Sequence, residues 1–230
     1  IRLRSETEMR RTILFDLDGT LVDTLPDLAA SLNRIIVTSG LPPFAPTEIA
    51  AMIGDGMPTL LARALEARCR PYDPALFARF EADYLAHVAV ASEPYPGTVE
   101  TLSALRDAGW RMAVATNKPE QAARHLLHAL ELERFFKVIA GGDSFPVRKP
   151  DPGHLLGALR LAGGDAAHAA MLGDHANDVK SARAAGLRPI FALWGYSRKE
   201  MADGARTAST ISAVPDLLET LVRPGTAPPA

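Results

Sequence analysis

Two aspartates, Asp16 and Asp18, lie two residues apart directly after the apolar run "TILF", and Gly19 follows them. Two neighbouring carboxylates can divide the work of phosphoryl transfer, because one can attack phosphorus while the other donates and accepts protons. Taken alone, the pair also fits an ordinary turn at the end of a strand, where Asp and Gly are common. Residues elsewhere in the chain that could take part in phosphoryl transfer decide between these two interpretations.

Three further apolar runs lead into residues that could serve the same chemistry. Thr116 and Asn117 follow "MAVA", Lys149 lies in the loop after "VIAGG", and Asp174 follows "AAMLG", with Asp178 four residues later. Parallel strands place their carboxyl ends along one edge of a sheet, where ligands bind. We therefore expect these side chains to converge in one crevice.

The expected crevice combines several carboxylates with one ammonium group and one hydroxyl. Carboxylates that crowd together raise one another's pKa unless a cation lies among them. An all-oxygen acidic site suits Mg²⁺, which takes one or two carboxylates, waters and a substrate phosphate oxygen. The ammonium group of Lys149 and the hydroxyl of Thr116 can hold the same phosphate opposite the metal. The sequence therefore predicts a magnesium-dependent phosphoryl-transfer site.

Each part of this pattern has a simpler local explanation. Thr116 and Asn117 can cap the following helix, Lys149 can be an exposed loop lysine, and "GDHANDV" can be a turn followed by a helix cap. The capping interpretation is compatible with anion binding, because the N–H groups at a helix N-terminus attract phosphate. The functional interpretation is favoured because suitable residues follow four separate strands, which a single motif could not show.

The order of elements that must position these residues alternates between strands and helices. Buried strands are predicted at residues 12–15, 112–116, 137–141, 169–172 and 188–193, and helices at 97–108, 120–132, 152–162, 178–185 and 213–222. Strands alternating with helices indicate an α/β fold with a doubly wound parallel sheet, a Rossmann-like core.

Residues 24–92 interrupt this alternation. They contain helix-like segments only, at 27–39, 47–53, 58–70 and 74–90. We expect a small all-helical cap inserted after the first strand, with "SEPYPG" at 92–97 as the hinge that leads back. The catalytic core then comprises residues 9–23 together with 93–222, and residues 1–8 and 223–230 are expected to be flexible ends.

The bulk composition limits the partners. Hydrophobic residues make up 47% of the 230 residues, charged residues make up 23%, and the net charge is −2, which suggests neither a nucleic-acid nor a membrane partner. No run approaches the roughly 18 consecutive apolar residues of a membrane span. Cys69 is the single cysteine, expected as a buried structural thiol, and it fits a reducing cytoplasm. We expect a monomer or a homodimer.

Four segments in this order, "DLDGTLVDT", "ATNKP", "RKPDP" and "GDHANDV", resemble the four motifs of the haloacid dehalogenase superfamily, phosphatase branch. The resemblance extends from Thr12 to about Leu221. Any one motif is weakly specific, but the four together are highly specific.

The resemblance implies a role for each motif residue. Asp16 would be the nucleophile, Asp18 the acid/base, and Thr116 and Lys149 would hold the phosphoryl group. Gly19 and Asn117 are expected to join them in binding the phosphate or the substrate. Mg²⁺ would be bound by Asp16, the backbone carbonyl of Asp18, and Asp174, with Asp178 supporting it through water. The implied reaction is hydrolysis through an aspartyl-phosphate intermediate.

The segments "IGDGMPTLL", "PYPG", "VATNKP" and "AGGDSFPVRKPDP" are most similar to phosphoglycolate phosphatases within this superfamily. The resemblance implies that 2-phosphoglycolate is the favoured small phosphomonoester, converted to glycolate and phosphate. Two residues depart from the subfamily pattern. His175 stands where Ser is frequent, and Asp55 stands where a small polar residue is common, so either can bear on substrate choice.

Other functions use related residues. A phosphatase for a sugar phosphate, a nucleotide or pyrophosphate would use the same core, and so would a phosphosugar mutase. A dehalogenase is disfavoured because that branch does not keep the second aspartate. A phospho-accepting signalling module also combines Asp, Thr, Lys and Mg²⁺ on a doubly wound sheet. It lacks an inserted cap, and a stable phospho-signal gains nothing from an acid/base such as Asp18. A pseudo-enzyme that only binds a partner conflicts with the complete set of catalytic positions.

Overall fold

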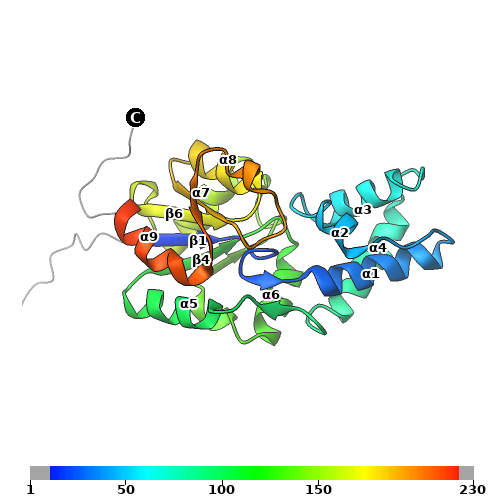
Figure 1. The fold of residues 1–230 in the computed structure, drawn as a ribbon, viewed down its shortest axis with the longest axis horizontal. Coiled ribbons are helices and arrows are strands. Elements are labelled where there is room, and N and C mark those ends of the chain that lie inside the picture. The colour runs from blue at the N-terminus through cyan, green and yellow to red at the C-terminus, as the bar shows by residue number, and fades with distance from the viewer. Residues whose placement is uncertain (1–10, 223–230) are drawn as a thin grey trace, which may run out of the picture.

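The computed structural model describes residues 11–222, and its centre is a six-stranded parallel sheet (Figure 1). The strand order is β5-β4-β1-β6-β7-β8. The strands are β1 (Thr12–Phe15), β4 (Arg111–Ala115), β5 (Val138–Ala140), β6 (Ala169–Gly173), β7 (Arg188–Ala192) and β8 (Arg206–Ala208). The five strands expected from the sequence are present. The sixth, β8, was missed because two of its three residues are exposed and it carries no apolar run.

Helices cover both faces of the sheet, as a doubly wound fold requires. They are α5 (Thr98–Asp107), α6 (Glu120–Ala129), α7 (Pro152–Ala162), α8 (Ala176–Ala184) and α9 (Val214–Leu221). Figure 1 shows α7 and α8 on one side of the sheet and α5 and α6 on the other. Phe15 belongs to the same buried cluster as Leu102 of α5, whereas Leu14 is buried with Leu155 of α7 and Ala182 of α8. Adjacent residues of one strand thus serve opposite cores.

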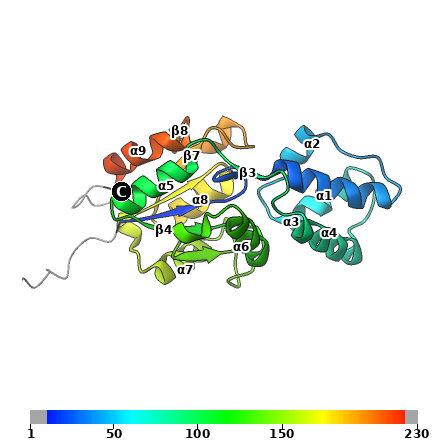
Figure 2. The same ribbon diagram turned by 90° about the horizontal axis from the view of Figure 1, so that it is seen from below.

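A group of four helices lies between two short strands. The strands β2 (Val22–Asp23) and β3 (Glu93–Pro94) pair antiparallel, and the chain between them forms α1 (Leu25–Thr38), α2 (Pro46–Ala50), α3 (Met57–Glu66) and α4 (Pro74–Ala86). In Figures 1 and 2 these helices stand together beyond one end of the sheet. The expected fold class, an α/β sheet with an all-helical insertion, is confirmed.

Several details of the insertion differ from the sequence prediction. Helix α2 ends at Ala50 rather than at residue 53, and α3 ends at Glu66 rather than at residue 70. Helix α4 ends at Ala86 rather than at residue 90, because the backbone N–H groups of Val90, Ala91 and Ser92 donate to the carboxylate of Asp27 instead of continuing a helix. Cys69, expected to be buried, is exposed. It follows the end of α3 in a left-handed backbone conformation that turns its side chain away from the core.

Within residues 11–222, no helix combines the length and apolar character needed to cross a membrane. The predicted flexible ends, residues 1–8 and 223–230, lie outside the described residues.

Candidate active site

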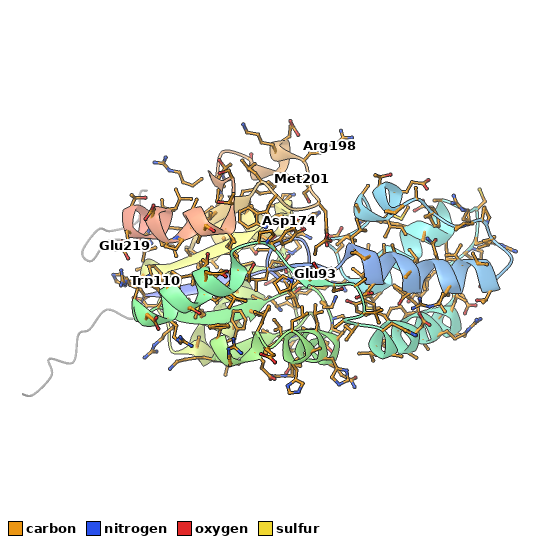
Figure 3. The ribbon with its side chains drawn as sticks, turned by 60° about the horizontal axis from the view of Figure 1, so that its bottom comes forward. Glu93, Trp110, Asp174, Arg198, Met201 and Glu219 are labelled. Atoms are coloured by element: carbon orange, nitrogen blue, oxygen red, sulfur yellow. The ribbon has the colours of Figure 1, made fainter. Side chains whose placement is uncertain are left out.

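The predicted site residues meet at the carboxyl edge of the sheet, next to the four-helix insertion. Asp16 and Asp18 follow β1, Thr116 and Asn117 follow β4, and Asp174 follows β6; all five line one pocket. Figure 3 shows Asp174 at the side of the sheet that faces the insertion. Lys149 and Asp178 border the same group, since the Lys149 ammonium nitrogen Nζ lies 2.9 Å from Asp16 Oδ1 and 2.7 Å from Asp178 Oδ1.

Three buried carboxylates form a candidate metal centre. Asp16, Asp174 and Asp178 each offer an oxygen, and these oxygens lie within 4.8 Å of one another. Burial, together with the charges of Asp16 and Asp178, raises the pKa of Asp174 to about 8. Burial likewise raises the pKa of Asp178 to about 6, although Lys149 acts against this rise. A cation among these carboxylates would remove the electrostatic cost, so the donor set fits a hard divalent metal.

The carboxylate of Asp174 is held in a defined orientation. Thr20 Oγ1 donates to its Oδ1 at 3.2 Å, and the backbone N–H of Tyr196 donates to its Oδ2 at 2.8 Å. Gly19 makes this approach sterically allowed. Its φ is +78°, and a Cβ at this position would lie 2.7 Å from Asp174 Oδ2 and 2.9 Å from the Tyr196 ring. Glycine at position 19 therefore permits both the turn and the close packing against Asp174.

Asp178 and Lys149 neutralise each other beneath the pocket. Both oxygens of Asp178 have partners, because Oδ1 accepts from Lys149 and Oδ2 accepts from the backbone N–H of His175 at 3.0 Å. Burial disfavours the charged form of Lys149, but the carboxylates of Asp16 and Asp178 outweigh it and raise the pKa of Lys149. Lys149 is therefore an ammonium ion next to Asp16. The Lys149–Pro150 peptide bond is cis.

One charged residue of the pocket received no role from the sequence. Lys118 is buried, its Nζ donates to Asp18 Oδ1 at 2.8 Å, and it lies 4.5 Å from the centroid of the Tyr84 ring in α4. Burial disfavours its charge, yet the coulombic attraction of Asp18 raises the pKa of Lys118. Lys118 belongs to the motif "ATNKP", but Asp18 and Tyr84 lie far from it in the sequence, so only the fold brings the three residues together.

A second missed feature is a set of contacts between the insertion and the core. Asn117 Nδ2 donates to the backbone carbonyls of Gly54 at 3.1 Å and of Lys149 at 3.0 Å. Asn177 Nδ2 donates to Asp55 Oδ1 at 2.6 Å. These contacts hold the loop between α2 and α3 over the pocket.

The two residues that depart from the subfamily pattern both take part in this closure. Asp55 forms an ion pair with Arg63 and accepts a hydrogen bond from Asn177. Burial by itself would raise the pKa of Asp55, but these two partners outweigh it and lower that pKa. The His175 ring packs directly against Gly54, where a Cβ would lie 2.5 Å from its Cδ2 atom. Burial lowers the pKa of His175, which favours the neutral ring.

Comparison with known proteins identifies the family. The family model described as haloacid dehalogenase-like hydrolase matches residues 10–186, which is more than half of the chain. The chain belongs to this family. The resemblance of its four motifs is thereby confirmed.

Relatives of this haloacid dehalogenase-like hydrolase include two named for one activity. The phosphoglycolate phosphatase of Caulobacter vibrioides is 43% identical over 192 residues, 82% of this chain and 81% of that protein. Phosphoglycolate phosphatase 1 of Pseudomonas aeruginosa is 38% identical over 219 residues, 92% of this chain and 80% of that protein.

Solved structures of the family share the fold. A crystal structure described as a predicted phosphoglycolate phosphatase from Haemophilus somnus aligns with a TM-score of 0.85 and 29% identity, covering 90% of this chain and 97% of that one. CbbY from Rhodobacter sphaeroides, solved in complex with phosphate, aligns with a TM-score of 0.76 and 28% identity, covering 90% and 96%.

Proposed function

We propose that this hydrolase is a phosphatase that cleaves small phosphomonoesters through an aspartyl-phosphate intermediate, with 2-phosphoglycolate as the favoured substrate. The observation that carries the proposal is the approach of Lys149 to Asp16 beside the acidic cluster of Asp16, Asp174 and Asp178. The carboxyl edge of the sheet thus brings together a nucleophilic carboxylate, an ammonium group and carboxylates that can bind a cation. This combination suits the transfer of a doubly charged phosphoryl group.

In the proposed reaction, a carboxylate oxygen of Asp16 attacks phosphorus, and the bond between phosphorus and the leaving oxygen breaks. Asp18 donates a proton to that oxygen and then accepts a proton from the water that hydrolyses the aspartyl-phosphate. Thr116 and Lys149 hold the phosphoryl oxygens, and Gly19 and Asn117 shape the loop around them. The side chain of Asn117 donates to two backbone carbonyls, which supports a positioning role for this residue.

The carboxylate cluster fits Mg²⁺ in particular, because its donors are all oxygen and two of the acids are strained electrostatically without a cation. We propose that Asp16, Asp174 and the backbone carbonyl of Asp18 would hold the ion. Asp178 would support it through water, since both of its oxygens already have protein partners. A bound Mg²⁺ neutralises the carboxylates and polarises a phosphoryl oxygen.

The helical insertion, residues 24–92, is proposed to act as a cap on a core formed by residues 9–23 and 93–222. Its loop at Gly54 and Asp55 already contacts the core, and Leu28, Met57 and Leu60 provide an apolar ceiling for the pocket. A closed cap excludes water from the reacting groups and limits the size of the substrate. Named relatives at 43% and 38% identity support phosphoglycolate as that small substrate.

Three wider assignments are part of the proposal. A small phosphorylated metabolite is the expected partner, the cytoplasm is the expected location, and the chain is expected to be a monomer or a homodimer. The single cysteine supports the cytoplasm, and the near-neutral charge argues against a nucleic-acid or membrane partner.

A phosphate-release assay tests the function. The purified protein with Mg²⁺ is presented with 2-phosphoglycolate, sugar phosphates, nucleotides and pyrophosphate, and kcat/KM is compared across the panel. We expect 2-phosphoglycolate to rank first, EDTA to abolish turnover, and Asp16→Asn to abolish it as well. Full activity in Asp16→Asn would exclude the covalent mechanism. A low rank for 2-phosphoglycolate would exclude the substrate but not the phosphatase class, and phosphorylation without turnover would favour a signalling module.

A further inference from the structure

The pocket contains a buried ammonium group that the proposed reaction does not use. The reaction needs Asp16, Asp18, Thr116 and Lys149. The backbone N–H of Lys118 donates to Thr116 Oγ1, but its ammonium group contacts Asp18 and the Tyr84 ring, and the proposed reaction gives that group no role. Lys118 nevertheless lines the pocket together with Asp18. Among the pocket-lining residues in 11–222, Lys118 is the only lysine or arginine.

We propose that Lys118 is the residue that recognises a carboxylate on the substrate, and so selects phosphomonoesters that carry an acid group next to the ester. This inference rests on the proposed phosphatase function and adds to it the residue that decides substrate class. The phosphate end of the substrate is assigned to Lys149 and the metal cluster, which leaves the opposite end of the molecule facing the other cation.

Geometry places the two ends at compatible positions. An acid that protonates the leaving oxygen must lie within hydrogen-bond reach of it, about 2.6–3.2 Å. Lys118 Nζ lies 2.8 Å from Asp18 Oδ1, and both residues line the same pocket. In 2-phosphoglycolate the carboxylate carbon is two bonds from the leaving oxygen. A carboxylate at that separation is within reach of the ammonium group that Asp18 already contacts.

The surroundings of Lys118 keep its charge in place and strengthen its attraction for an anion. The side chain has no exposure to bulk water, so an added carboxylate would meet it in a medium of low dielectric constant. The face of the Tyr84 ring lies 4.5 Å away and attracts the ammonium group. Burial raises the pKa of the Tyr84 hydroxyl to about 12, so it stays neutral beside the cation.

The other cations near the cap are less suited to this role. Arg63 is paired with Asp55, and together with Arg148 it lines a second pocket, which Lys149 also borders. The His175 ring is favoured in its neutral form by burial. Apolar side chains, among them Leu28, Met57 and Leu60, line much of the remaining pocket. A carboxylate placed there without Lys118 would lose its hydration and gain no counter-charge.

The test compares two substrates of the same size in three variants. The substrates are 2-phosphoglycolate and 2-hydroxyethyl phosphate, which replaces the carboxylate with a neutral hydroxymethyl group. In Lys118→Met and Lys118→Gln we expect kcat/KM for 2-phosphoglycolate to fall about 10- to 100-fold more than kcat/KM for 2-hydroxyethyl phosphate, mainly through KM. Lys118→Gln can still donate to Asp18, so it separates loss of charge from loss of the Asp18 contact. Lys137→Met, which removes an exposed lysine, should leave the ratio unchanged.

The outcomes separate this inference from the proposed function. If the wild-type protein prefers 2-phosphoglycolate and both Lys118 variants keep that preference, the carboxylate site is elsewhere and the phosphatase function stands. If the wild-type protein hydrolyses both substrates equally well, carboxylate recognition is excluded without any variant. If it hydrolyses no phosphomonoester, the proposed function itself fails.

Discussion

The carboxylate of Asp27 and the backbone of Ser92 are 65 residues apart in the sequence, yet the Ser92 N–H donates to Asp27 Oδ2 at 2.8 Å. The Ser92 hydroxyl donates to the same oxygen at 2.6 Å, and the N–H groups of Val90 and Ala91 donate to this carboxylate at 3.0 Å. One side chain in the first turn of α1 therefore joins the two chain segments that connect the insertion to the core. A buried carboxylate with several N–H partners forms strong, charge-assisted hydrogen bonds.

Asp27→Ala should destabilise the protein, because it leaves several of these donors without a partner. We expect the free energy of unfolding to fall by on the order of 3 kcal/mol, measured by urea denaturation. Asp27→Asn keeps one carbonyl oxygen as an acceptor and should cost less. Asp73 offers a matched control, because its exposed carboxylate caps α4 through a single N–H, that of Ala75. Equal losses in Asp27→Ala and Asp73→Ala would contradict the joining role of Asp27.

Gly19→Ala should damage the site beyond its effect on the backbone. Gly19 and Gly109 share a φ of +78°, but an added Cβ meets Asp174 and Tyr196 at position 19 and nothing within 4 Å at position 109. Gly109→Ala reports the backbone cost alone, about 1 kcal/mol in the free energy of unfolding. We expect Gly19→Ala to cost more and to lower kcat/KM at least about 10-fold, because Asp174 must move. If the two variants had the same stability and activity, Gly19 would be needed only for its positive φ and not for its close packing against Asp174.

The metal-free protein should lose stability as pH rises. The pKa of Asp174 is raised from 3.8 to about 8 in the folded state, so this carboxyl binds a proton more readily when folded than when unfolded. Below about pH 4 the group is protonated in both states and costs nothing. As pH rises from about 4 toward 8, the Asp174 carboxyl loses its proton readily in the unfolded state, whereas the folded state disfavours the carboxylate. The free energy of unfolding therefore falls over this range. Urea denaturation in EDTA at pH 5, 6, 7 and 8 should therefore give falling free energies of unfolding.

Asp174→Asn is the control for this pH dependence, because an amide does not ionise. Its slope between pH 5 and 8 should be smaller than that of the wild-type protein in EDTA. Millimolar Mg²⁺ should raise the wild-type melting temperature through preferential binding to the folded state, and should raise that of Asp174→Asn much less. If Mg²⁺ left the wild-type melting temperature unchanged, the assignment of the acidic cluster as a metal centre would be contradicted.

Asn177→Ala should loosen the cap. Asn177 Nδ2 lies 2.6 Å from Asp55 Oδ1, and this bond joins the loop over the pocket to α8. Without it, we expect faster amide hydrogen exchange in residues 53–56 and a several-fold increase in KM, because closure over the substrate is less favourable. Thr59→Ala is the control, because the hydroxyl of Thr59, in the first turn of α3, makes no hydrogen bond to the core within residues 11–222. The same exchange rates in both variants would exclude Asn177 as a closing contact.

Much of the site followed from sequence because its residues stand at strand ends. Apolar runs identify buried strands, and a parallel sheet places the carboxyl ends of its strands together, so local patterns already group Asp16, Thr116 and Asp174. The pairing of Lys149 with Asp16 and Asp178 was harder to predict from the sequence. It depends on how a loop returns across the sheet, which no local pattern encodes.

The sequence by itself determined the α/β class, the helical nature of residues 24–92 and the types of group available for phosphoryl transfer, because hydrophobic periodicity and motif order are local properties. Only the tertiary structure decided how Lys118 is placed. Its partners, Asp18 after β1 and Tyr84 in α4, are brought to it by the sheet and by the insertion. Long-range packing sets the environment of a charge, and that environment decides whether a lysine is a solvated surface group or a buried counter-ion in a pocket.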